Sequence, residues 1–190
     1  LPQSAVEPLQ QVGILNEKGN EFFYGCIVVP IFAADGTLGE MYGRSVEGSR
    51  HLYLPGAHRG VLNAKAAEVF DEIILTEAVF DALSLYTIGV KNVIPCYGTN
   101  GFTEDHREAL KKTKQIFVAF DNDAAGENAA RDLAVKLRAP CVEVHRVPLP
   151  AEPGKDLNDY VRYLRRQGMK AEEIKTAFED LLKHAPRIGF

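Results

Sequence analysis

Three acidic residues, Glu77, Asp121 and Asp123, directly follow apolar segments that have the length and composition of buried strands. In a parallel sheet the carboxyl ends of the strands meet at one edge, where α/β proteins bind ligands, so these side chains are expected to converge. Converging carboxylates repel one another and raise one another's pKa, and a cation relieves that cost. Mg²⁺ suits such a site, because it uses one or two carboxylates, keeps several waters and binds substrate phosphates. The residue types therefore predict an open magnesium site, in which Mn²⁺ can substitute.

Each acid also has a purely structural explanation. Asp123 precedes an alanine-rich segment and would cap a helix there. Glu77 would interact with the positive end of the helix that follows it, and Asp121 would be an ordinary loop residue. Asp81 lies one helical turn beyond Glu77, where it would either support the metal ligands by hydrogen bonding or form a surface salt bridge. Singly, each structural explanation is the more common one, whereas three acids after two separate strands favour the metal site.

The elements that must position these acids alternate between strand and helix from residue 72 onward. The pattern predicts strands at 73–76, 93–96, 116–120 and 141–147, and helices at 78–88, 103–112, 124–138, 157–167 and 171–184. Such alternation indicates parallel strands joined by right-handed crossovers. We expect an α/β fold with a four-stranded, mostly parallel sheet, flanking helices and two closing helices at the C-terminal end.

The N-terminal third has a different, β-rich pattern. Residues 22–32 are rich in aromatic and β-branched side chains, Asp35-Gly36 supplies a turn, and 38–42 would return as the second strand of a hairpin. A short helix is expected at 64–70. We therefore divide the chain into a β-rich basic subdomain (1–67), an α/β domain (68–150), and an acidic loop with the closing helices (151–190).

The charge distribution restricts how this chain could bind nucleic acid. The net charge of -4 argues against a protein that coats nucleic acid nonspecifically, because phosphate neutralisation needs a surplus of Lys and Arg. The stretch from 41 to 65 is nevertheless basic, since it contains Arg44, Arg50, Arg59 and Lys65 together with His51 and His58. A solvated loop and an anion-binding surface are both compatible with this pattern.

The cysteines and the hydropathy pattern exclude several classes of protein. The three cysteines, Cys26, Cys96 and Cys141, are odd in number and widely spaced, which argues against a disulfide framework or a zinc site and favours buried free thiols. No apolar run approaches the roughly 18 residues of a membrane span, so we expect a cytoplasmic protein with no membrane partner. The chain begins at Leu1 rather than Met, as a fragment or a processed product would.

Several motifs in this sequence resemble those of bacterial and phage-type DNA primases. Residues 75–81 (LTEAVFD), Gly98-Thr99 and 120–126 (FDNDAAG) resemble the TOPRIM signature of these enzymes, and the DxDxAG element is its most specific part. Residues 149–159, with Leu-Pro followed by GKDLND, resemble the primase segment that supplies a further acid, which would be Asp156.

The β-rich N-terminal part shows a similar resemblance. Residues 29–31 (VPI), Asp35-Gly36 and Gly43-Arg44 are similar to the small subdomain that precedes TOPRIM in bacterial primases, where basic residues face the metal site. Arg44 matches directly, whereas His51 and Arg59 occupy positions where the family tends to have lysine. The resemblance covers about residues 22 to 160.

The resemblance implies a TOPRIM, Rossmann-like fold and a primase-type nucleotidyl transferase that makes short primers on single-stranded DNA from nucleoside triphosphates. The implied catalytic and metal-binding acids are Glu77, Asp121, Asp123 and Asp156, with Asp81 and Asn158 supporting them. The implied nucleotide- or template-binding residues are Arg44, His51, Arg59 and Lys65.

The sequence departs from the family at three positions and keeps two alternatives open. Ala78 replaces a usual glycine, Asn158 a usual acid, and Cys26 a common arginine. No Cys/His ligand cluster for a template-reading zinc ribbon occurs, so we expect a zinc-binding or helicase domain elsewhere in the full protein or in a partner. The alternatives are a TOPRIM nuclease and a non-catalytic nucleic-acid-binding module of a larger replication or mobile-element protein.

Overall fold

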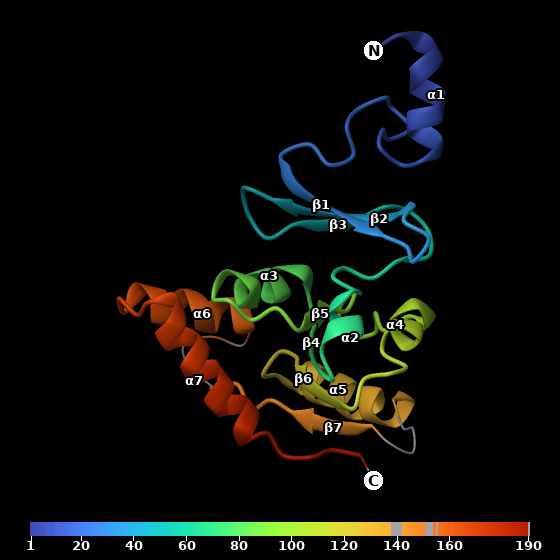
Figure 1. Ribbon diagram of the computed structural model, residues 1–190. Coiled ribbons are helices and arrows are strands. Elements are labelled where there is room, and N and C mark those ends of the chain that lie inside the picture. The colour runs from blue at the N-terminus through green and yellow to red at the C-terminus, as the bar shows by residue number, and fades with distance from the viewer. Residues whose placement is uncertain (138–141, 151–153, 155, 190) are drawn as a thin grey trace. The chain divides into compact units, whose positions relative to one another are not determined.

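A computed structural model describes residues 1–137, 142–150, 154 and 156–189. The described chain divides into two compact units, Leu1–Gly60 and Val61–Phe190 (Figure 1). Each unit has its own sheet, so each is described separately.

The first unit contains a helix and a three-stranded antiparallel sheet. Its elements are α1 (Gln3–Gln11), β1 (Cys26–Phe32), β2 (Leu38–Ser45) and β3 (His51–Tyr53), and the strand order is β1-β2-β3. The turn between β1 and β2 forms as the Asp-Gly pair predicts. The Asp35 carboxylate accepts hydrogen bonds from the backbone N–H and the hydroxyl of Thr37, and Gly36 adopts a φ of 81°, which glycine tolerates without strain.

The interior of the first unit is small and contains one buried acidic side chain. Among the described residues of this unit, the buried apolar side chains are Leu15, Phe23, Ile31 and Tyr42. Glu40 is only 1% exposed, and its carboxylate accepts hydrogen bonds from the N–H groups of Met41 and Leu54 and contacts His58 Nδ1 at 2.7 Å. These bonds satisfy a carboxylate that would otherwise be costly to bury.

The second unit contains a four-stranded parallel sheet with helices on both faces. The strands are β4 (Glu72–Thr76), β5 (Val93–Pro95), β6 (Gln115–Ala119) and β7 (Glu143–Arg146), in the order β5-β4-β6-β7, and every neighbouring pair is parallel. The helices are α2 (Ala66–Val69), α3 (Val79–Thr87), α4 (Glu104–Ala109), α5 (Ala124–Lys136), α6 (Leu157–Arg166) and α7 (Ala171–Lys183) (Figure 1).

Alternate residues of β4 face two separate apolar cores. Ile73 and Leu75 belong to a cluster that includes Ala130 and Leu133 of α5, whereas Ile74 belongs to a cluster that includes residues of α3, α6 and α7. All three β4 residues are fully buried. A strand covered on both faces reads as a continuous apolar run, which is why the periodicity of 73–76 is not that of a one-sided strand.

The predicted α/β fold is confirmed, and the structure adds two elements that the sequence pattern did not indicate, α1 and β3. The predicted strand at 141–147 is described only from residue 142, because Cys141 lies outside the described residues, and its regular part is Glu143–Arg146. Cys96 is a buried free thiol as predicted, but Cys26 is partly exposed, so the prediction of burial is wrong there. Across the described part of the chain, no helix is both long and apolar enough to cross a bilayer.

Candidate functional site

Four of the predicted site acids lie where elements of the second unit begin or end at the carboxyl edge of the sheet. Glu77 directly follows β4, and Asp121 follows β6 after one intervening residue. Asp123 and Asp156 are the N-cap residues of α5 and α6. Because β4 and β6 are hydrogen-bonded neighbours, their exits are adjacent, and the backbone N–H of Asp121 lies 3.4 Å from Glu77 Oε2. The structure thus brings Glu77 and Asp121 together.

The turn from Asp121 to Asp123 is tight because α5 begins immediately against the end of β6. Asp123 Oδ1 accepts a 2.9 Å hydrogen bond from the N–H of Gly126 and so caps α5. A Cβ atom at residue 126 would lie 2.2 Å from the Asp121 carbonyl oxygen, closer than any real contact. The glycine of the DxDxAG element is therefore required by this approach of helix to strand.

The middle residue of the turn is directed to a different part of the chain. The Asn122 side-chain amide donates a 3.2 Å hydrogen bond to the carbonyl oxygen of Leu149. Leu149 N–H in turn bonds the carbonyl of Val147, just after β7. Asn122 thus connects the acidic turn to the segment that leads toward Asp156, part of which (151–153 and Lys155) lies outside the described residues.

The loop after β5 fixes the backbone of Glu77. Gly98 N–H donates to the Glu77 carbonyl at 2.9 Å, and Cys96 N–H donates to that of Thr76 at 2.8 Å. Burial, together with the negative charge of Glu77, raises the pKa of the Cys96 thiol to about 12. The Glu77 carboxylate is therefore close enough to Cys96 to influence its ionisation electrostatically.

Asp81 is buried on α3 and anchors the start of α6. It is 5% exposed, its Oδ1 accepts a 3.1 Å hydrogen bond from Asn158 N–H, and Ser84 donates to Asn158 Oδ1 at 3.0 Å. Burial, together with the charges of Asp156 and Asp121, raises the pKa of Asp81 to about 7. The alternative of a surface salt bridge for Asp81 is thus wrong.

The predicted basic residues are divided between the two units. Arg44 on β2 is paired in register with His51 on β3 in the first unit, where Arg59 is exposed and contributes to lowering the pKa of Asp35. Lys65 precedes α2 in the second unit. The roles of these four residues in binding nucleotide or template stay a prediction.

The donor chemistry of the acidic site fits a hard divalent cation that keeps much of its water. All four predicted ligands are carboxylates, and after burial the charges of Asp156 and Asp121 contribute to the raised pKa of Asp81. In the part of the chain that the structure describes, no three His, Cys, Asp or Glu side chains are grouped so that together they could hold a metal ion. An open site with one or two direct carboxylate ligands is the arrangement typical of Mg²⁺.

A buried arginine that the sequence patterns did not single out lies under the acidic turn. Arg146, the last residue of β7, is 8% exposed, and its guanidinium bonds the carbonyl oxygen of Asp121 at 2.9 Å. The signal that the sequence offers for it is a charged residue at the alternate position of β7 that Val142 and Val144 occupy on the core-facing side. Its burial depends on acceptors that the fold brings to it from β6.

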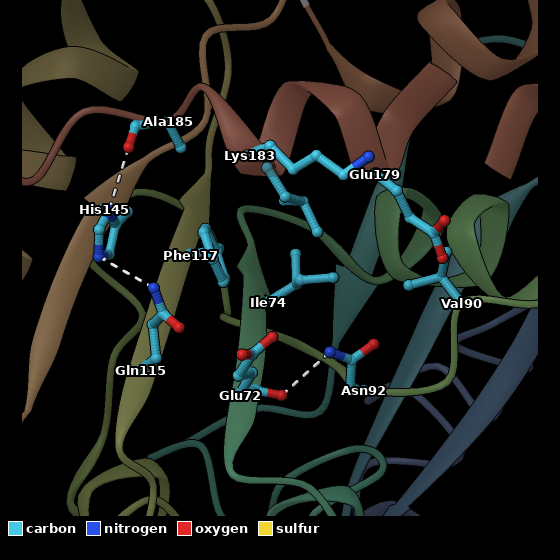
Figure 2. Close-up of a pocket in the computed structure, with 11 residues that line it drawn as sticks. Glu72, Ile74, Val90, Asn92, Gln115, Phe117, His145, Glu179, Lys183 and Ala185 are labelled. Atoms are coloured by element: carbon cyan, nitrogen blue, oxygen red, sulfur yellow. Dashed lines mark hydrogen bonds between the residues drawn. The ribbon is translucent and has the colours of Figure 1, made fainter. Parts of the chain in front are cut away.

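A pocket of about 470 Å³ lies at the opposite edge of the same sheet (Figure 2). Its lining includes Glu72 and Gln115, which begin β4 and β6, whereas the acidic residues follow the ends of these strands. The side chain of His145 also lines the pocket (Figure 2). Its Nε2 lies 3.1 Å from the Gln115 amide nitrogen, and its Nδ1 lies 3.0 Å from the Ala185 carbonyl oxygen. Both ring nitrogens of His145 are thus engaged within the protein, and the pocket lies apart from the acidic site.

Sequence comparisons relate the region that contains this site to known proteins. Residues 74–161 match a family described as Toprim-like. The chain is 31% identical over 115 residues to a DNA primase of Aquifex aeolicus (strain VF5), an alignment that covers 59% of this chain and 22% of the relative. It is 26% identical over 173 residues to a DNA primase of Staphylococcus aureus (strain COL), covering 82% of this chain and 28% of the relative. The chain thus spans about a quarter of the length of these curated relatives.

Solved structures show the same fold. A DnaG primase catalytic domain bound to single-stranded DNA superposes with a TM-score of 0.75 at 20% identity, over 97% of this chain and 62% of that one. The Escherichia coli primase catalytic core gives 0.73 at 21% identity, over 96% and 60%. An Aquifex aeolicus primase structure with zinc-binding and RNA polymerase domains gives 0.71 at 21% identity, over 99% and 50%.

Proposed function

This chain carries a TOPRIM domain of the bacterial DNA primase type, and from it we propose that the chain is the catalytic core of a Mg²⁺-dependent primase that synthesises short primers on single-stranded DNA. The observation that carries the proposal is the contact between Asp121 and Glu77 at the carboxyl ends of adjacent strands, inside the matched region. Parallel sheets place their ligand sites at this edge.

The acidic residues and Asn158 would have two roles, binding the metal ion and positioning a metal ligand. Glu77, Asp121, Asp123 and Asp156 would hold Mg²⁺ or Mn²⁺, which supplies Lewis-acid stabilisation of a reacting phosphoryl group. Asp81 and Asn158 would position Asp156, because the bond between them fixes the first turn of α6.

The basic residues and the partners complete the proposal. Arg44, His51, Arg59 and Lys65 would neutralise phosphates of the nucleotide or the template backbone. Nucleoside triphosphates and single-stranded DNA would be the substrates, and the enzyme would act in the cytoplasm. A zinc-binding or helicase domain, in the rest of the protein or in a partner, would recognise the template; one fold neighbour contains a zinc-binding domain, and another is the primase fragment of the bacteriophage T7 primase-helicase.

The direct test is primer synthesis on single-stranded DNA with labelled nucleoside triphosphates and Mg²⁺. We expect products that disappear with EDTA and in the double variant Asp121→Asn with Asp123→Asn, which keeps side chains of the same size. A reaction with labelled DNA and no nucleotides is the control, since only a nuclease gives products there. Full synthesis by the double variant would refute the assignment.

A non-catalytic nucleic-acid-binding module is the second candidate. Asn158 replaces the acid that primases usually have and accepts a hydrogen bond from Ser84, so it adds no charge to the site. On this reading the double variant would bind single-stranded DNA as the unsubstituted chain does, and neither protein would make primers.

A further inference from the structure

Arg146 makes an unusual number of hydrogen bonds to the backbone beneath the acidic turn. Its Nη1 donates to the carbonyl oxygens of Val118 at 3.2 Å, Phe120 at 3.1 Å and Val147 at 3.2 Å, and its Nη2 donates to that of Asp121 at 2.9 Å. Its Nε donates to Glu127 Oε2 at 3.1 Å in an ion pair. All three guanidinium nitrogens are therefore used inside the protein.

These partners lie on both sides of the Asp121–Asp123 turn. Phe120 and Asp121 lead into the turn from β6, and Glu127 lies in the first turn of α5, where its N–H bonds the carbonyl of Asp123 at 2.9 Å. Arg146 thus connects the residue that enters the turn with the helix that leaves it. The Asp121 carbonyl that it binds is also the oxygen that leaves no room for a Cβ at Gly126.

Arg146 also places a positive charge close to the acidic turn. A buried guanidinium within hydrogen-bond distance of the Asp121 backbone offsets part of the repulsion among the nearby carboxylates. Groups that orient metal ligands without touching the metal typically change metal affinity 10-fold to 100-fold when they are altered.

We propose that Arg146 is a positioning residue of the acidic site, which fixes the Asp121–Asp123 turn in the geometry that binds a divalent cation. The proposal rests on the proposed function for the use of that cation, but the positioning itself is a property of the described contacts. Arginine is required because lysine has a single nitrogen with three donors and cannot reach the carbonyls that lead into the turn together with the Glu127 carboxylate that follows it.

The test compares Arg146→Lys with Arg131→Lys in the 190-residue chain. Arg131 is a matched control, because it pairs with the same Glu127 carboxylate at 3.1 Å but is exposed on the surface of α5. Mn²⁺ affinity is measured by electron paramagnetic resonance, and hydrogen exchange of residues 119–127 is measured without metal. We expect Arg146→Lys to weaken Mn²⁺ binding about 10-fold to 100-fold and to speed exchange in that segment, and Arg131→Lys to change neither.

The outcomes separate this inference from the proposed function. If Arg146→Lys binds Mn²⁺ and exchanges its amide hydrogens as the unsubstituted chain does, the inference is overturned and the primase proposal stays intact. If the unsubstituted chain binds Mn²⁺ but makes no primers, and Arg146→Lys binds Mn²⁺ more weakly, the inference is supported and the primase proposal is rejected. Failure of the unsubstituted chain to bind Mn²⁺ would reject both. If Arg146→Lys does not fold, Glu127→Gln replaces it: a several-fold loss of Mn²⁺ affinity supports the inference, and an unchanged affinity overturns it.

Discussion

The pKa of Asp81 reflects both its burial and the charges around it. Its pKa in the folded protein is about 7, against 3.8 for an unperturbed aspartate, because burial and the charges of Asp156 and Asp121 disfavour its ionised form. A raised carboxyl pKa stabilises the folded state fully below about pH 4, and this stabilisation is lost as the pH rises through 7. Asp81 is therefore partly neutral at neutral pH.

We predict that Asp81→Asn becomes more stable relative to the unsubstituted chain as the pH rises from 4 to 8. Each pH unit between the two pKa values corresponds to about 1.4 kcal/mol, so the total effect is at most about 4 kcal/mol. The measurement is the free energy of unfolding by urea across this range. Asp132→Asn, an exposed change on α5, is the control and should show no such trend. A pH-independent difference for Asp81→Asn would contradict the burial argument.

At the level of elements, helix α5 begins on an acid that is also a predicted metal ligand. Asp123 caps α5 through Gly126 N–H, so the structural and the functional explanations of this residue are compatible. Asparagine caps helices about as well as aspartate, whereas alanine costs about 1 kcal/mol. The two substitutions therefore separate capping from charge.

We predict that Asp123→Asn leaves the free energy of unfolding of the metal-free chain within about 0.5 kcal/mol of the unsubstituted value, and that Asp123→Ala lowers it by about 1 kcal/mol. Both variants should bind Mn²⁺ more weakly, because both lose the carboxylate. Urea denaturation and a Mn²⁺ titration measure the two effects. Unchanged Mn²⁺ binding by Asp123→Asn would show that Asp123 serves only as a cap.

Most elements of the second unit could be predicted because their local signals are strong. Thr103 was expected to begin a helix, and it caps α4 through a bond from His106 N–H. β3 was not predicted because a three-residue strand has no readable alternation, and α1 was not predicted because it contains Pro8, which cannot donate within a helix. Local sequence thus identifies elements that carry their own start and stop signals.

The candidate site was predictable only in part, for a related reason. The acids at strand ends are visible in the sequence, and the resemblance to the TOPRIM signature associates the segment of Glu77 with that of Asp121. Arg146 was not predictable, because its importance comes from the carbonyl oxygens of Phe120 and Asp121, which follow β6 about 25 residues earlier and which only the folded sheet brings to it. Asp81 was ambiguous between two roles until its burial was known.

At the scale of the whole molecule, the two units differ in how much apolar core each contains. Both large clusters of buried apolar residues consist of residues from Val61 onward, whereas the first unit has only four buried apolar side chains among its described residues. Hydrophobic burial is the dominant favourable term in folding, so the second unit contains most of what stabilises the chain. The predicted metal ligands all lie in it as well.

We predict that residues 61–190 fold alone and bind Mn²⁺ with an affinity within about twofold of the full chain, because the acids, their caps and Arg146 are all retained. Single-stranded DNA binding should fall, since Arg44, His51 and Arg59 are removed and each lost phosphate contact weakens a salt-dependent attraction. Circular dichroism, Mn²⁺ titration and fluorescence anisotropy with labelled DNA measure these properties. The same fragment with Asp121→Asn is the control, which should stay folded and lose Mn²⁺ binding. A folded fragment with Mn²⁺ affinity more than tenfold below that of the full chain would show that residues 1–60 contribute to the metal site itself.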